Sequence, residues 1–278
     1  MLEIGAALAQ LAQFVERHRR ILVLTGAGMS TASGIPGYRD DEGVRRGNAP
    51  VQGPEFRKHA AVRQRYWARS MVGYPRLAAA QPNAGHRALA RLGAAGRLGT
   101  VLTQNVDGLH QGGGSSAVLE LHGSIHHVVC LDCHAGLARG VVQTMLEQAN
   151  PGVAGEVAAP LPDGDANIEP DVLARFDVPL CPHCGGTLKP DVVFFGDGVP
   201  KDRTAQALDA MAQADALLVV GSSLMVFSGF RFCRLAAESG KPIAAINLGK
   251  TRADELLSIK LAACAEQALP ALELLLGA

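Results

Sequence analysis

The sequence predicts an α/β fold, with a parallel sheet domain and an inserted small domain that carries the cysteine spacing of a zinc site. Short apolar runs that end in glycine-rich or polar loops alternate with helical patterns, as in parallel sheets. Two C-x-x-C pairs lie in a stretch that interrupts this alternation. A chain of 278 residues suits one large domain, or one domain with a smaller insertion.

The composition narrows the class of protein. The 26 basic residues balance the 26 acidic residues, which argues against a nucleic-acid binder, while 48% hydrophobic residues allow a sizeable core. Apolar runs stay shorter than the ~18–20 residues that cross a bilayer, so no membrane association is expected. The first residues lack the pattern of a secretory signal. A cytoplasmic protein is expected, and its alanine- and arginine-rich composition suggests a bacterial source.

The chain opens with a predicted amphipathic helix, in which Ile4, Leu8, Leu11 and Val15 recur at helical spacing. Residues 20–25 then predict a buried strand that leads into the glycine-rich sequence GAGMSTASG. This is the expected form of a strand, a tight loop and a helix start.

Three later segments show the same pattern of an apolar run followed by a polar loop, and helical patterns separate them. Strands with polar carboxyl ends are predicted within residues 99–108, 216–224 and 242–249, and helices over 83–94 and 202–213. Ligands of open parallel sheets bind at the carboxyl ends of the strands. The loops after these strands are therefore candidate ligand-binding segments.

Two segments depart from the alternation and are interpreted as the inserted small domain. Residues 41–80 have a helical pattern without a strand, and residues 124–190 contain both C-x-x-C pairs. The parallel sheet domain is accordingly assigned to 1–40, 81–123 and 191–278. The small domain is assigned to the helical segment 41–80 and the zinc ribbon 124–190.

Four cysteines have metal-binding spacing. Cys130 and Cys133 form one pair, and Cys181 and Cys184 form the second. Two such turns complete a closed tetrahedral shell for one structural Zn²⁺. Buried thiols or redox pairs are the alternative. Four nearby histidines are expected to be surface residues rather than ligands, namely His126, His127, His134 and His183, and Cys233 is expected to pack within a helix.

The loop after the first strand is a weak phosphate-binding signal taken alone. It departs from G-x-G-x-x-G because Thr31 stands in the sixth position. Glycines still allow the backbone to approach a pyrophosphate, and Ser30 and Thr31 add hydroxyl donors. A tight turn without a ligand is the alternative.

Polar side chains also end the second strand. TQNVDGLH (103–110) brings together Gln104, Asn105, Asp107 and His110, which are costly there unless they bind a ligand or one another. His122 follows in ELHGS (120–124). Taken alone, such a histidine is more often structural than catalytic.

Read together, these strings resemble the sirtuin family over nearly the whole chain. The matching strings, in order, are GAGMSTASGIPGYRD (26–40), TQNVDGLH, LHGS (121–124), the C-x-x-C pairs, KPDVVFFGD (189–197), GSSLMV (221–226) and NLG (247–249). Within the family, RQRYWAR (63–69), the long zinc insert with PDGDA (162–166) and KPDVVFFGD are similar to the class II branch. That branch includes a mitochondrial lipoamidase and ADP-ribosyltransferase.

The resemblance implies that the parallel sheet domain is a Rossmann-like, NAD-binding domain, that the inserted small domain binds zinc, and that acyl-lysine enters the cleft between them. The implied NAD-binding residues are Gly26, Ala27, Gly28, Ser30, Thr31, Ile35, Pro36, Tyr38, Arg39, Gln104, Asn105, Val106, Asp107, Gly221, Ser222, Ser223, Asn247, Leu248, Gly249 and Cys264. The implied substrate residues are Val193, Phe195, Gly196, Met225 and Val226, which flank a peptide as β-strand partners.

The resemblance also implies the chemistry. The acyl oxygen attacks the anomeric carbon of NAD as nicotinamide leaves, giving an alkylimidate, and His122 then acts as general base on a ribose hydroxyl. The products are free lysine, nicotinamide and O-acyl-ADP-ribose. This predicts an NAD-dependent protein-lysine deacylase.

Two positions bear on how the family pattern applies here. Gly37 replaces the aspartate that is usual in the family, which gives the loop extra backbone freedom. Tyr66 and Arg69 have the Y-x-x-R spacing of sirtuins that prefer acidic acyl groups, and an arginine fork can receive a carboxylate. An ordinary surface arginine beside a half-buried tyrosine is the alternative.

Two other functions compete with deacylation. Protein mono-ADP-ribosyl transfer would use the same NAD site without an acyl-lysine. A zinc-ribbon binding module would explain the cysteines but leave the other motifs without a role, and zero net charge argues against nucleic acid. The expected partners are acyl-lysine proteins or peptides, and a monomer is expected.

Overall fold

The computed structural model describes residues 2–40, 42–46, 50–153 and 173–278. Its main feature is a six-stranded, fully parallel sheet in the order β3-β2-β1-β7-β8-β9. The strands are β1 (Ile21–Thr25), β2 (Val101–Thr103), β3 (Val118–Glu120), β7 (Ala216–Val220), β8 (Ile243–Ile246) and β9 (Ile259–Leu261). Counted along the chain this is the order 3-2-1-4-5-6 of a dinucleotide-binding fold. The predicted fold class is confirmed.

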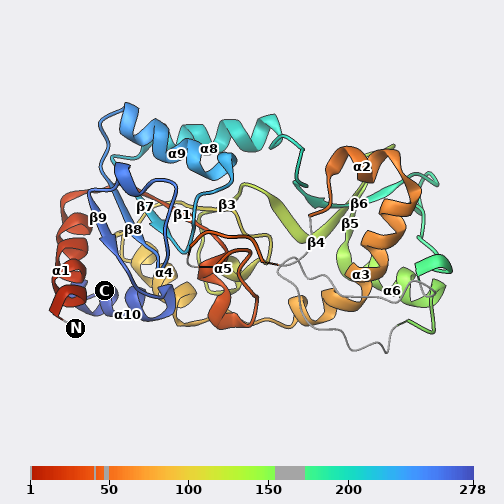
Figure 1. The fold of residues 1–278 in the computed structure, drawn as a ribbon, viewed down its shortest axis with the longest axis horizontal. Coiled ribbons are helices and arrows are strands. Elements are labelled where there is room, and N and C mark those ends of the chain that lie inside the picture. Colours follow the sequence, from red (N-terminus) through yellow and green to blue (C-terminus); the bar gives the residue numbers. More distant parts are fainter. Residues whose placement is uncertain (1, 41, 47–49, 154–172) are drawn as a thin grey trace.

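Helices cover both faces of this sheet, as Figure 1 shows. One face packs against α1 (Leu2–Arg17), α4 (Ala84–Ala94) and α10 (Ala265–Leu276), and the other against α8 (Lys201–Gln213) and α9 (Phe227–Glu238). Strands β1, β7 and β8 are buried at every residue because helices exclude water from both sides. Shorter elements are α5 (Leu109–Gly112) and 3₁₀ turns at Ala27–Met29, Thr31–Ser33 and Asp254–Leu256.

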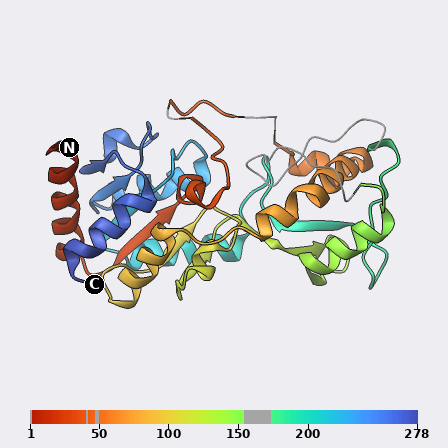
Figure 2. The same ribbon diagram turned by 90° about the horizontal axis from the view of Figure 1, so that it is seen from below.

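A smaller lobe lies at the other end of the molecule (Figures 1 and 2). It contains an antiparallel sheet in the order β5-β4-β6, formed by β4 (Gly123–Cys130), β5 (Gly136–Ala138) and β6 (Leu188–Val192). Its helices are α2 (Gly53–Lys58), α3 (Ala60–Ala78) and α6 (Arg139–Ala149). Phe56, Trp67 and Phe194 lie in its separate apolar core.

The long elements agree with the sequence pattern, but two strands of the large sheet were not predicted. The predicted helices within 1–20, 83–94 and 202–213 correspond to α1, α4 and α8. Strands β3 and β9 each have three residues, and most of their side chains are only partly buried. Such short segments show no distinct periodicity. The sequence PDGDA (162–166) lies outside the described residues.

No helix in the described part of the chain combines the length and apolarity needed to cross a bilayer.

Two buried histidines, one in α4 and one in α5, lie next to each other near the end of β1. The His86 and His110 rings are 4.9 Å apart, and His110 Nε2 is 2.8 Å from Thr25 Oγ1. Burial is the main cause that lowers the pKa of His86 to about 4 and that of His110 to about 3. Both rings are therefore neutral in the folded protein near neutral pH.

This pair predicts acid sensitivity. Both pKa values lie below the unfolded value of about 6.5, so from there down to about pH 4 the unfolded chain binds more protons, and stability falls as pH falls. The expected loss at pH 5 is about 2 kcal/mol per histidine. Urea unfolding of wild type and His110→Gln at pH 7.5 and pH 5 measures this. An equal pH dependence in both proteins would contradict it.

Candidate active site

A cavity of about 790 Å³ extends from the carboxyl end of the large sheet towards the small lobe. It opens where β1 and β7 are neighbours, the point at which the strand order reverses and open α/β sheets bind ligands. Of the residues implied by the resemblance, the following line it: Gly26, Ala27, Gly28, Ser30, Thr31, Ile35, Tyr38, Arg39, Tyr66, Gln104, Asn105, Val106, Asp107, His122, Val193, Phe195, Gly196, Gly221, Ser222, Ser223, Met225, Val226, Asn247, Leu248, Gly249 and Cys264.

The loops after β1 and β7 approach each other closely, and glycine makes this contact geometrically feasible. Gly28 N donates to Gly221 O at 2.8 Å. A Cβ on Gly221 would lie 2.4 Å from Met29 N, and Gly221 also has a positive φ of 60°. A side chain is therefore excluded by both sterics and backbone conformation. The glycines leave a shallow backbone surface at the sheet edge, as pyrophosphate binding requires.

A buried polar network follows β1 and β2. Ser30 Oγ donates to Asp107 Oδ2 at 2.7 Å, and Asn105 Nδ2 donates to Ser30 Oγ at 3.1 Å and to Gly26 O at 3.0 Å. Leu109 N donates to the other Asp107 oxygen at 3.0 Å. Asn105 and Asp107 thus share Ser30 as a partner, whereas Gln104 Nε2 donates to Ser222 Oγ at 2.8 Å. These bonds to neighbouring side chains offset the cost of burying the polar groups.

His122 lies between the sheet edge and the small lobe. Its Nδ1 is 2.9 Å from Gln104 O, and its Nε2 is 2.8 Å from Ser228 Oγ. A carbonyl oxygen only accepts, so Nδ1 carries the proton and Nε2 carries the lone pair. Burial lowers the pKa of His122, although the hydrogen bond to Gln104 opposes this. The imidazole is therefore a neutral base that lines the cavity.

The walls nearest the small lobe come from the segments 193–196 and 225–226 and from the loop around Gly43. Val193 N donates to His122 O at 2.8 Å, which fixes the segment Val193–Gly196 beside the histidine. Met225 lies against the loop at Gly43, and the Arg45 guanidinium lies 5.1 Å from the centre of the Phe195 ring. Phe195 and Val226 are each 37% exposed, so they present apolar surface at the mouth of the cavity.

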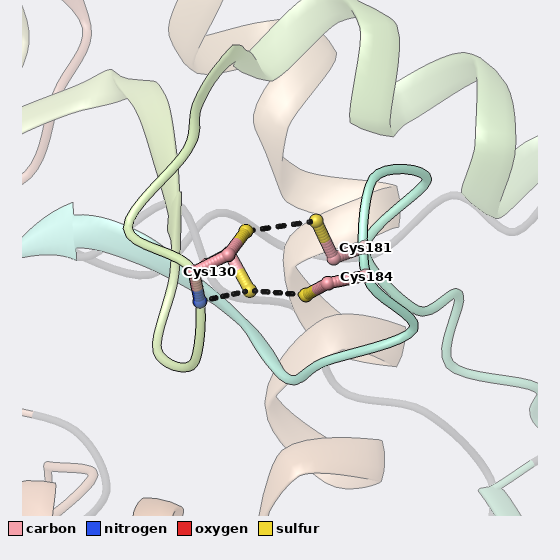
Figure 3. Close-up of side chains that lie close together, drawn as sticks. Cys130, Cys181 and Cys184 are labelled. Carbon is pink, nitrogen blue, oxygen red and sulfur yellow. Dashed lines mark hydrogen bonds between the residues drawn. The ribbon is translucent and has the colours of Figure 1, made fainter.

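The four predicted metal ligands converge in the small lobe (Figure 3). Cys130 Sγ is 3.5 Å from Cys184 Sγ, and Cys133 Sγ is 3.8 Å from Cys181 Sγ. A tetrahedral zinc with Zn–S bonds of about 2.3 Å needs sulfur–sulfur separations of about 3.8 Å. A hydrogen bond from Cys133 N is the main cause that lowers the pKa of Cys130 to about 7. The cluster is compatible with one structural zinc.

Three residues do not lie where they were expected from the sequence. Pro36 and Arg69 are not among the residues that line the cavity. The prediction that His126 is a surface residue is wrong, because its Nε2 donates to Asp107 O at 2.9 Å and its Nδ1 is 3.3 Å from Tyr74 Oη. His127, His134 and His183 are exposed as predicted, and Cys233 is buried in α9.

Gly37 has no steric need to be glycine. A Cβ there would meet Arg39 O at 3.6 Å, an ordinary contact, and Gly37 is not among the glycines with positive φ. The usual aspartate therefore fits this backbone. Its absence leaves the loop with more conformational freedom in the unfolded state.

Two functional residues were missed from the sequence. Asn83 caps α4 and also donates to Met29 O at 2.9 Å and to Ser33 Oγ at 3.0 Å, so it holds the glycine-rich loop. The capping position before a helical pattern was its available signal. Ser228 meets His122 at the start of α9, and no spacing rule links residues 106 positions apart.

Comparison with known proteins agrees with this geometry. The model of the Sir2 family matches residues 26–228. The chain belongs to the Sir2 family. An NAD-dependent protein deacetylase of Xanthomonas axonopodis pv. citri is 55% identical over 259 residues, covering 93% of this chain and 88% of the relative. NAD-dependent protein deacetylase 3 of Pseudomonas syringae pv. tomato is 54% identical, covering 91% of this chain and 90% of the relative.

Solved sirtuin structures share the fold of this sirtuin. A Sir2 bound to acetylated peptide has a TM-score of 0.78 at 27% identity, covering 97% of this chain and 98% of that chain. A complex described as Sir2-p53 peptide-NAD+ has a TM-score of 0.77 at 28% identity, covering 96% and 98%. The predictions of a sirtuin enzyme and of NAD as its cosubstrate are confirmed at the level of the family.

Proposed function

We propose that this sirtuin is an NAD-dependent protein-lysine deacylase that transfers the acyl group to ADP-ribose and releases nicotinamide, with His122 as general base. When bound, NAD supplies the ADP-ribose acceptor and the nicotinamide leaving group. The observation that carries the proposal is the neutral His122 ring, with Nδ1 bonded to Gln104 O and Nε2 directed to the cavity lining. Nε2 is the atom that takes the proton from a ribose hydroxyl.

The polar network supports the cosubstrate assignment. The backbone of the loops at Gly26–Gly28 and Gly221–Ser223 would face the pyrophosphate, because only glycine permits their close approach. Asn105, Ser30 and Asp107 would face the nicotinamide half, held by their mutual hydrogen bonds. The residues present therefore fit NAD.

Substrate binding is assigned to the two walls of the cavity mouth. The segments 193–196 and 225–226 offer backbone beside which a peptide can bind as an added strand. The exposed side chains of Phe195 and Val226 supply apolar contacts. Related solved structures are described as bound to an acetylated peptide and to a p53 peptide with NAD+, which supports a peptide substrate.

A product assay tests the proposal. Purified protein and NAD are offered identical peptides that bear acetyl, glutaryl, hydroxymethylglutaryl, lipoyl or long-chain acyl lysine, and products are identified by mass spectrometry. Nicotinamide release with matched O-acyl-ADP-ribose is expected. A peptide or protein that gains ADP-ribose, without acyl transfer, would replace deacylation by mono-ADP-ribosyl transfer.

We further propose placement in the class II branch and a preference for acidic or bulky acyl groups. RQRYWAR carries the branch resemblance, and Tyr66 and Ser70 of α3 line the cavity. Arg69 lies on the same helix and would have to reach a distal carboxylate. A monomeric state, a cytoplasmic bacterial location and the absence of nucleic-acid partners remain predictions.

Arg69→Met tests the acidic preference. Activity on glutaryl-lysine is expected to fall about tenfold or more, because a charge-assisted hydrogen bond contributes about 1.5–3 kcal/mol. Activity on acetyl-lysine should change little, since acetyl has no carboxylate. The values of kcat/KM for both peptides measure this. Equal losses on both peptides would contradict the assignment of Arg69.

A further inference from the structure

The hydroxyl of Ser228 forms a hydrogen bond with Nε2 of His122, the ring nitrogen that carries the lone pair. Its Oγ lies 2.8 Å from His122 Nε2, while His122 Nδ1 lies 2.9 Å from Gln104 O. Because Nδ1 donates to the carbonyl, Nε2 is an acceptor, and Ser228 Oγ–H is the donor. The imidazole is thus held at both nitrogens, which fixes the plane of the ring and the direction of its lone pair.

The first turn of α9 is built to make this contact. Ser228 is the second residue of the helix and is half-buried, and it lines the cavity. At the next position, a Cβ on Gly229 would lie 2.4 Å from Gln104 Oε1, so glycine lets the helix pack directly on Gln104. Gln104 Nε2 in turn donates to Ser222 Oγ at 2.8 Å. The helix start, Gln104 and His122 therefore form one packed unit.

We propose that Ser228 is a positioning residue that holds the Nε2 lone pair of His122 in the orientation needed for proton abstraction. This inference rests on the proposed role of His122 as general base. When a ribose hydroxyl reacts, its O–H bond breaks, its electron pair stays on the attacking oxygen, and the proton forms an N–H bond at Nε2. Because Nε2 has a single lone pair, the Ser228 O–H turns away from it as the ribose hydroxyl approaches. The serine oxygen then accepts from the new N–H, since a hydroxyl can donate or accept.

Kinetics of Ser228→Ala test the proposal with two readouts. Formation of O-acyl-ADP-ribose is expected to fall about tenfold in kcat, the scale of one hydrogen bond. Exchange of labelled nicotinamide into NAD needs only departure and return of nicotinamide, so it should persist. Ser228→Thr should restore most of the rate by retaining the hydroxyl. Ser239→Ala, exposed at the other end of α9, is the matched control and should resemble wild type.

A spectroscopic readout needs no NAD. In ¹⁵N-labelled wild type, His122 should show a protonated Nδ1 and a hydrogen-bonded Nε2. Ser228→Ala should shift the Nε2 resonance and leave Nδ1 protonated, since Gln104 O is unchanged.

The outcomes separate this inference from the proposed function. An unchanged Nε2 resonance with an unchanged rate would overturn the role of Ser228. A parallel loss of exchange and product formation would also overturn it, because Ser228 would then shape the NAD site. His122→Ala is run beside it: if that variant still forms product normally, the base assignment itself fails.

Discussion

Replacing Cys181 with serine is expected to abolish zinc binding and to unfold the small lobe. Structural zinc contributes on the order of 10 kcal/mol to folding in small zinc modules, far more than one core contact. The four sulfurs lie within 4.8 Å of one another and join the ends of β4 and β6, so their loss frees both ends of the small sheet. Metal analysis and thermal unfolding measure the change, and deacylation should be lost with the lobe.

Cys233→Ala is a control for this experiment. Cys233 is fully buried in α9, outside the cluster, so its replacement removes a thiol without removing a metal ligand. Zinc content should stay at one per chain. A Cys181→Ser protein that retained wild-type melting and turnover without zinc would show that the cluster is not a structural site.

Replacing His122 with alanine is expected to lower deacylation about 10²- to 10⁴-fold, the usual contribution of a general base. NAD affinity should change little, because the glycine loops and the Asn105 network do not depend on His122. Nicotinamide exchange should continue, since it precedes the proton transfer. Kinetics of both reactions and calorimetric titration with NAD measure these effects.

The control for this change is His127→Ala, which removes an exposed imidazole from β4, the strand that follows His122. It should leave both reactions unchanged. If His122→Ala instead abolished NAD binding, the ring would be a structural part of the nucleotide site rather than its base.

The large sheet was predictable where its strands are long and fully buried. In β1 and β7 five consecutive apolar or small residues end in a glycine-rich loop, and this local pattern survives folding because helices cover both faces. Strands β3 and β9 were missed because three partly buried residues owe their extended form to pairing with a neighbour, not to their own sequence.

The site was predictable where chemistry is concentrated in short motifs. The paired cysteines and the polar residues 104–107 can be recognised in the sequence by their spacing. The Ser228–His122 contact, in contrast, is created only by tertiary packing. His126 was misassigned for the same reason, since its partners Asp107 and Tyr74 come from a distant loop and helix. Sequence patterns report residue chemistry, but not which strand ends become neighbours.

The strand order also has a consequence for biosynthesis on the ribosome. Ile21 of β1 pairs with Ala216 of β7, so the centre of the large sheet joins parts of the chain that are synthesised far apart in time. One edge of β1 can pair with β2 early, but its other edge must wait for β7 to emerge, whereas the small sheet pairs β4 with β6 before the carboxyl-terminal strands exist. Non-local pairing slows folding. Completion of the nucleotide crevice should therefore be a late event, and the exposed apolar β1 should be the chaperone-dependent segment of the nascent chain.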